Sequence, residues 1–167
     1  MSTATLELTT PSDREIAMTR VFNAPRQLVF DCFTQPELLK RWGIGPRAWT
    51  LTECEIDLRV GGKWRFVTTK NTGETMTIYG VFLEVVAPEK LVQTEHFEEA
   101  WYPGEGHNTT TFVESGGKTT MTIRCLYDSK ETRDIVLKSG MEGGVSTSYD
   151  RLAELLPTFA AEANNVA

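Results

Sequence analysis

Residues 60–69 read Val-Gly-Gly-Lys-Trp-Arg-Phe-Val-Thr-Thr, and this stretch decides the fold class. The two glycines indicate a turn or a bulge where a strand begins. Successive side chains of a strand point to opposite faces, so Trp64 and Phe66 share one face. Lys63 and Arg65 share the other. The sequence therefore predicts a sheet with an aromatic inner surface and a solvated outer surface.

The two-residue period continues over much of the chain. Strands are expected where apolar and polar residues alternate between turns rich in Gly, Pro and Asn. The segment Ser115-Gly116-Gly117 is typical of a hairpin turn, and the short connections favour an antiparallel meander. The expected strands cover residues 49–58, 63–69, 76–86, 91–97, 108–114 and 118–127.

Two short helices are expected before this meander. A strand over residues 14–24 leads to Pro25 and, after one helix, to Pro36. Proline fits the first turn of a helix because its missing N–H would have no partner there. The glycines and the proline of residues 43–46 end the second helix.

The C-terminal region is predicted to be helical, with Met141, Val145, Ser148 or Tyr149, Leu152 and Leu155 or Leu156 on one stripe. Asp128 or Ser129 can cap it, and Gly140 divides it into a piece near residues 130–138 and a longer helix over residues 141–156. The expected order is therefore one strand, two helices, six strands and a long C-terminal helix.

Length and composition indicate one globular domain. The chain has 167 residues, of which 40% are hydrophobic and 24% charged. We find no linker and no repeat. We expect a single domain over residues 14–156, with flexible termini at residues 1–13 and 157–167.

The charge and cysteine patterns indicate which classes of partner to exclude and which cell compartment to expect. Seventeen basic against 23 acidic residues give a net charge of −6, which argues against nucleic acid as a partner. No run of 18 apolar residues occurs, so no membrane span is expected. The N-terminus lacks the pattern of a secretory signal, and three scattered cysteines fit a reducing cytosol. The predicted localisation is cytoplasmic.

The chain contains few of the residue patterns that are typical of catalytic or metal-binding sites. His96 and His107 are not arranged like metal ligands, and the chain has no Gly-x-Ser-x-Gly segment. Glu53, Glu55 and Asp57 alternate along one strand, so they either form a glycosidase-like acidic site or pair with basic residues of the next strand. We assign no catalytic residue, no metal and no cofactor from the sequence.

Several short segments, taken together and in order, carry a resemblance to a known family. They are Thr-Arg-Val-Phe-Asn-Ala-Pro (19–25), Val-Phe (29–30), Pro-Glu-Leu (36–38), Arg-Trp (41–42), Val-Gly-Gly-Lys-Trp-Arg-Phe (60–66), Gly80, Glu-Val (84–85), Gly-Met-Glu-Gly-Gly (140–144) and Asp-Arg-Leu (150–152). The set resembles the START-like (SRPBCC) superfamily. It most closely resembles the branch related to the C-terminal domain of the activator of the ninety-kilodalton heat-shock-protein ATPase.

The resemblance implies an α+β helix-grip fold, in which a curved antiparallel sheet wraps the long C-terminal helix around a hydrophobic cavity. Members of the superfamily bind lipids, steroids and polyketides, and some catalyse cyclisations. This chain departs from its relatives at Val145, where they often have a large aromatic residue, and in the turn at residues 42–46. Both departures are expected to change the cavity rather than the fold.

The candidate ligand-binding residues are apolar and aromatic side chains expected on the inner face of the sheet, on the C-terminal helix and in loops. They either fill a core or line a cavity. Trp42 and Trp101 are expected in loops at the cavity mouth, and His96 and Tyr149 are expected to orient a ligand through hydrogen bonds. The full set is Trp42, Trp64, Phe66, Ile78, Phe82, His96, Trp101, Phe112, Met141, Val145 and Tyr149.

Three functions are consistent with these observations. The first is a cytosolic binding module for a small hydrophobic molecule. The second is a cyclase or hydrolase acting on a polyketide-like substrate, with His96 or a buried carboxylate as the base. The third is a stress-related protein that acts on a chaperone partner through its surface. A homodimer is compatible with each of them.

Overall fold

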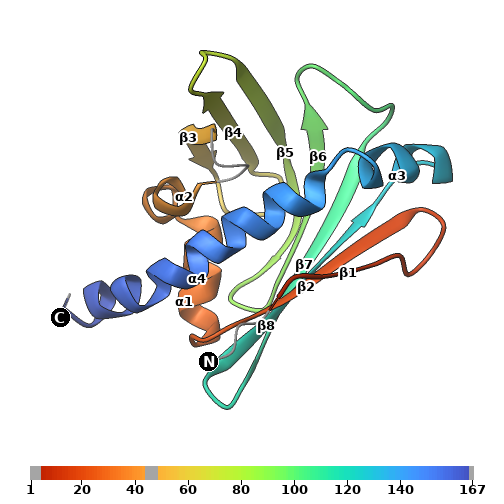
Figure 1. Cartoon of the computed structure of the whole chain (residues 1–167). Helices are drawn as coiled ribbons and strands as arrows, with labels where there is room; N and C mark the ends of the chain where they lie inside the picture. The colour runs from red at the N-terminus through yellow and green to blue at the C-terminus, as the bar shows by residue number, and fades with distance from the viewer. Residues whose placement is uncertain (1–4, 44–48, 166–167) are drawn as a thin grey trace.

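The computed structural model describes residues 5–43 and 49–165. Within these ranges, eight strands form one antiparallel sheet in the order β1-β2-β8-β7-β6-β5-β4-β3. The sheet curves around the C-terminal helix, drawn in blue in Figure 1. This arrangement is the predicted α+β helix-grip fold. The strands are β1 (Glu7–Thr9), β2 (Glu15–Phe22), β3 (Trp49–Ile56), β4 (Lys63–Lys70), β5 (Thr75–Val86), β6 (Lys90–Phe97), β7 (Gly106–Ser115) and β8 (Lys118–Leu126).

Two pairs of helices lie against the concave side of this sheet. Gly140, with a φ of 84°, separates α3 from α4 at the predicted position. The Ser129 hydroxyl accepts a hydrogen bond from the Thr132 backbone N–H at 3.1 Å, so Ser129 is the N-cap of α3. The helices are α1 (Arg26–Thr34), α2 (Pro36–Trp42), α3 (Lys130–Leu137) and α4 (Met141–Asn165).

The predicted order of elements is confirmed, with differences at both termini. Strand β1 lies in the segment that was expected to be flexible, where it pairs with β2. Helix α4 continues through Pro157 to Asn165. Residues 157–165 are therefore helical, whereas the sequence predicts a flexible terminus there. Residues 44–46 of the expected turn lie outside the described residues, as do residues 1–4 and 166–167 of the predicted termini.

Contacts with α2 explain why α4 continues past its proline. The Phe159 side chain is only 2% exposed, and the Arg41 guanidinium lies 4.7 Å from the centre of its ring. Arg41 also donates two hydrogen bonds to the Glu162 carboxylate, at 2.6 and 2.9 Å. These tertiary contacts offset the backbone hydrogen bond that Pro157 cannot donate.

Two arginine contacts fix the middle of α4 to the rest of the fold. Arg20 on β2 is 5% exposed, and its Nη1 donates to Asp150 Oδ1 at 2.7 Å. Arg151 Nη1 donates to the carbonyl of Trp42 at the end of α2. The Asp-Arg pair of the sequence thus connects α4 to the sheet on one side and to α2 on the other.

The acidic residues of β3 lie on the outer surface. Glu53 Oε1 accepts a hydrogen bond from Arg65 Nη1 at 3.0 Å, and Glu55 lies opposite Arg65 in the register of β3 and β4. Both glutamates are exposed. Of the two interpretations of this acidic strand, the structure supports the solvated face.

A cavity between the sheet and the C-terminal helix

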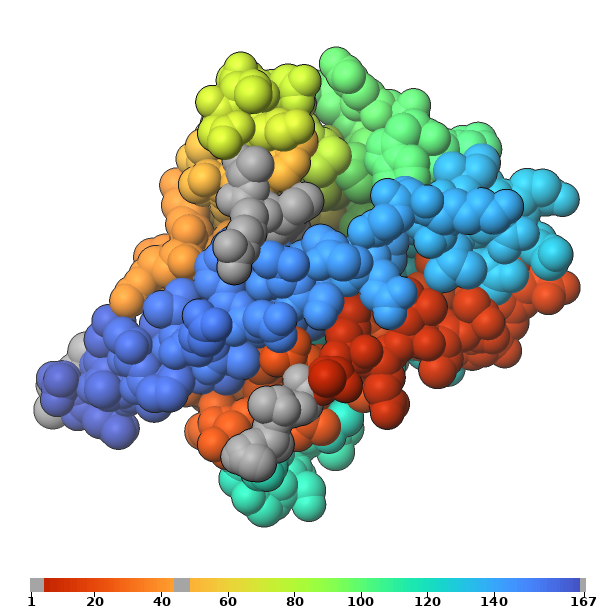
Figure 2. All heavy atoms as spheres, in the orientation of Figure 1, coloured from red at the N-terminus to blue at the C-terminus, as the bar shows by residue number. Residues whose placement is uncertain are grey.

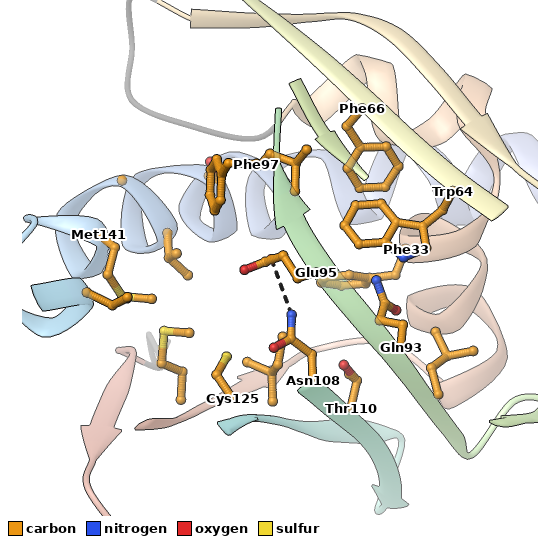
Figure 3. Close-up of a pocket in the computed structure, with 18 of the residues that line it drawn as sticks. Phe33, Trp64, Phe66, Gln93, Glu95, Phe97, Asn108, Thr110, Cys125 and Met141 are labelled. Atoms are coloured by element: carbon orange, nitrogen blue, oxygen red, sulfur yellow. Dashed lines mark hydrogen bonds between the residues drawn. The ribbon is translucent and has the colours of Figure 1, made fainter. Parts of the chain in front are cut away.

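A cavity of about 590 Å³ separates the concave face of the sheet from the N-terminal half of α4. Figure 2 shows α4, in blue, crossing the concave side between the yellow-green turn that joins β4 to β5 and the red β1–β2 hairpin. The cavity walls are mainly aromatic and aliphatic, and Figure 3 shows Trp64 and Phe66 of β4 on one side of the space and Met141 of α4 on another.

Ten of the eleven residues predicted for the site line this cavity. Trp64, Phe82 and Phe112 are almost fully buried, whereas Phe66 and Val145 are half-buried. The ten residues are Trp42, Trp64, Phe66, Ile78, Phe82, Trp101, Phe112, Met141, Val145 and Tyr149. The inner face predicted from alternation in β4 and from the stripe on α4 is therefore a cavity wall rather than a filled core.

The two loop tryptophans have different positions. Trp101 lies in the connection between β6 and β7, is 41% exposed and packs edge-on against Phe97 with ring centres 5.3 Å apart. Trp42, in contrast, is the last residue of α2 and is 1% exposed. Its indole N–H donates to the Cys32 carbonyl at 3.0 Å. The prediction that Trp42 lies at the mouth is wrong, because this hydrogen bond turns the ring into the core.

The eleventh residue, His96, lies on the other face of the sheet. Its ring stacks on that of Tyr79 with centres 5.4 Å apart, and its Nε2 is 2.7 Å from Glu105 Oε2. Its neighbours Glu95 and Phe97 face the cavity instead. Since side chains alternate along β6, placing Glu95 and Phe97 inside puts His96 outside, and the prediction that His96 orients a ligand in the cavity is wrong.

The contacts of Glu105 fix the loop that carries Trp101. Its carboxylate bridges the two histidines, with Oε2 2.7 Å from His96 Nε2 and Oε1 2.7 Å from His107 Nε2. Its backbone N–H donates to Asp128 Oδ2 at 3.3 Å. These bonds lie outside the cavity, yet they position the segment whose Trp101 ring lines it.

A polar stripe crosses the floor of the cavity on β6 and β7, and the sequence analysis missed it. Glu95 Oε2 accepts a hydrogen bond from Asn108 Nδ2 at 3.2 Å, and Glu95 Oε1 lies 3.4 Å from the donating hydroxyl of Tyr102. Gln93 and Thr110 extend the stripe, as Figure 3 shows. The alternation of side chains along β6 could have revealed this stripe. Residues 91 and 97 are apolar and therefore face inward, and residues 93 and 95 lie on the same face of the strand.

Burial in this apolar space disfavours the charged forms of the ionisable groups of the cavity. Desolvation raises the pKa of Glu95, and the hydrogen bonds from Asn108 and Tyr102 offset part of that rise. Desolvation likewise raises the pKa values of Tyr102, Tyr127 and Cys125 far above neutrality. Among the described residues that line the cavity, Glu95 is the one carboxylate, so it is the group whose ionisation a bound ligand can change most directly.

We expect Glu95→Gln to raise the melting temperature at pH 7. The pKa of Glu95 is higher in the folded state than its unperturbed 4.5, so the folded state binds more protons and loses stability as the pH rises from about 4.5 through the folded pKa. Glutamine stays neutral throughout. The stabilisation should be present at pH 7 and disappear near pH 4, as measured by thermal unfolding across that range. Equal melting temperatures at pH 7 would contradict the raised pKa.

Comparison with known proteins identifies the family. The family model described as "Activator of Hsp90 ATPase homolog 1-like protein" matches residues 23–157. The chain belongs to this family. Membership places it generally among ligand-binding modules and co-chaperone-like proteins, within the START-like superfamily that the sequence segments indicated.

Several solved structures are similar to this chain in fold. A crystal structure from Rhodobacter sphaeroides has a TM-score of 0.87 at 27% identity, covering 92% of this chain and 99% of the other. The protein Ms6760 from Mycobacterium smegmatis has a TM-score of 0.80 at 26% identity, covering 92% of this chain and 97% of the other. CalU16 from Micromonospora echinospora, at 19% identity and a TM-score of 0.60 over 96% of this chain and 91% of its own, shares the fold alone. No curated protein sequence matches the chain.

Two further properties of the described residues bear on partners. Across residues 5–43 and 49–165, no group of three or more His, Cys, Asp and Glu side chains is arranged to hold a metal ion. In the same part of the chain, no helix has the length and apolar character needed to cross a bilayer.

Proposed function

We propose that this family member is a binding module for a small hydrophobic molecule, held between the sheet and α4. The observation that carries the proposal is the cavity of about 590 Å³ with aromatic walls. A core packed to ordinary density leaves few voids larger than a water molecule, whereas ligand sites typically measure roughly 300–1,000 Å³. The cytosol is the proposed compartment, since Cys32, Cys54 and Cys125 are all free thiols.

Native mass spectrometry of the purified protein tests the proposal, together with titration of the neutral fluorescent probe N-phenyl-1-naphthylamine. We expect either a co-purified apolar mass that is lost on denaturation, or saturable binding of one probe molecule. A protein that shows neither would contradict the proposal.

Filling the cavity should weaken this binding strongly without unfolding the protein. Val145 is half-buried on α4 and lines the cavity, so in Val145→Trp the indole would occupy the space of the ligand. We expect an affinity for the probe at least about tenfold weaker, because the ring displaces apolar contacts of the ligand. Glu154→Trp, on the exposed side of the same helix, is the control and should bind normally. Equal affinities of the two variants would place the ligand elsewhere.

The same variants separate this function from its alternatives. An enzyme acting in the cavity would use Glu95 as its base, since His96 is outside, and would form product beyond one equivalent. A chaperone partner recognised through the surface would be retained equally by wild-type protein and Val145→Trp. Loss of probe binding in Val145→Trp alone supports the binding module.

A further inference from the structure

The charge of the cavity restricts what a ligand can place in it. Among the described residues that line the cavity, Glu95 is the only carboxylate and none is Lys, Arg or His. A ligand carboxylate would meet the acidic side chain of Glu95, with no basic side chain among the described lining residues to pair with it, in a protein whose net charge is −6. Anionic amphiphiles such as fatty acids are therefore disfavoured.

The polar stripe contains one buried hydrogen-bond acceptor that lacks a donor. Asn108 is 4% exposed, and its Oδ1 has no hydrogen-bond partner within the described structure. A buried acceptor without a donor is costly, so such atoms usually indicate a partner that binds there. Figure 3 shows the Asn108 amide nitrogen turned toward Glu95, which leaves the amide oxygen on the other side of the group, and Asn108 is one of the residues that line the cavity. Glu95 and Asn108 thus offer acceptor oxygens side by side.

The surroundings of these acceptors suit an apolar body that carries a positive charge. Trp64, Phe66 and Phe97 provide ring faces and edges around the cavity. Ring faces attract cations, and the same surfaces bury aliphatic or aromatic groups. A protonated amine has three N–H donors, which match the Glu95 carboxylate, Asn108 Oδ1 and the side-chain oxygen of Gln93 or Thr110 on the same stripe.

We propose that the cavity selects apolar amines, with the ammonium group bound by Glu95 and Asn108 and the apolar body against the aromatic walls. This inference rests on the proposed function and deepens it by naming the ligand class. An ammonium removes the uncompensated charge that an ionised Glu95 would otherwise have in an apolar space. It also donates to the orphaned Asn108 oxygen, which neither an anion nor a pure hydrocarbon can do.

The raised pKa of Glu95 is compatible with this selection. When a protonated amine binds, its charge favours the ionised carboxylate and lowers the pKa of Glu95 again. Asn108 on β7 and Tyr102 in the loop donate hydrogen bonds to Glu95, and Cys125 and Tyr127 also lie within its electrostatic reach from β8 and the residue that follows it. His96, on the outer face, is the one basic group that acts on Glu95 among the causes of its pKa shift. No basic side chain among the described residues that line the cavity competes with the ligand for the carboxylate.

Three ligands of one shape test the proposal. Naphthalene-2-methanamine, naphthalene-2-methanol and 2-naphthoic acid differ at the polar end, as cation, neutral donor and anion at pH 7. We expect the amine to displace N-phenyl-1-naphthylamine with an affinity about tenfold or more above that of the alcohol, and the acid to bind most weakly. Calorimetric titration of the unlabelled protein provides the independent measurement.

Two variants test whether Glu95 causes the preference for the amine over the alcohol. In Glu95→Gln, the ratio of amine to alcohol affinity should fall to about one, because the neutral amide no longer attracts the charge. Glu98→Gln removes an exposed carboxylate three residues further along and should keep the wild-type ratio. An amine that binds no better than the alcohol, or an acid that binds best, would overturn the inference while the cavity still binds the probe. Failure of the probe itself to bind would instead contradict the proposed function.

Discussion

Gly80→Ala should lower the free energy of unfolding by roughly 2–4 kcal/mol, from the combined cost of overpacking and of a disturbed buried hydrogen bond. An added Cβ would lie 1.9 Å from the Thr94 carbonyl oxygen and 2.7 Å from Trp64 Nε1. The Trp64 indole crosses this position to donate to the same carbonyl at 3.2 Å. The absent side chain at residue 80 is what allows the ring to lie across β5 and reach β6.

Chemical denaturation of purified protein measures this loss, with Gly143→Ala as the matched control. A Cβ at Gly143 meets nothing within 4 Å, and this glycine lies in the first turn of α4. Alanine there should stabilise the protein by about 0.5–1 kcal/mol, because it has less conformational freedom to lose on folding. Two variants with the same chemical change should therefore shift stability in opposite directions. A Gly80→Ala protein as stable as wild type would show that the Trp64 ring does not occupy this place.

Trp64→Asp should abolish binding of N-phenyl-1-naphthylamine and strongly destabilise the protein. The Trp64 side chain is 3% exposed, packs against Phe66 with ring centres 5.0 Å apart and lines the cavity. Truncating a buried tryptophan costs roughly 3–5 kcal/mol. The new carboxylate would also be buried without a partner, so the cavity wall would hydrate and lose its affinity for apolar molecules.

The outer face of the same strand provides the control for Trp64→Asp. Lys63 is exposed on β4, so Lys63→Asp introduces the same carboxylate outside the cavity and should leave probe affinity unchanged. Circular dichroism and probe titration are measured on both variants. If Trp64→Asp does not fold, the stable cavity-filling variant Val145→Trp provides the same test of the site. A folded Trp64→Asp protein with wild-type affinity would exclude this cavity as the binding site.

Alternation along single elements was sufficient to predict the apolar centre of two facing cavity walls. The pattern of β4 placed Trp64 and Phe66 on the inner face, and the stripe on α4 placed Met141, Val145 and Tyr149 opposite them. These inferences depend on the two-residue and 3.6-residue periods, which the backbone imposes wherever the element forms. These five residues line the cavity for this reason, whereas Trp42 and Trp101 were predicted from loops. That a cavity remains open among them does not follow from the pattern, because the distance between sheet and helix depends on how all elements pack.

The order of elements from β2 to α4, the division of the C-terminal helices at Gly140 and the family could all be predicted from the chain, because they depend on local propensities and on a set of short motifs. That Glu95 faces the cavity while His96 pairs with Glu105 outside it became apparent only in the folded protein. Likewise, only packing against Arg41 and α2 keeps α4 helical beyond Pro157. The difference has one physical reason: propensity and period act within a segment, whereas register, burial and the pairing of charges depend on residues that are distant in sequence and adjacent in space.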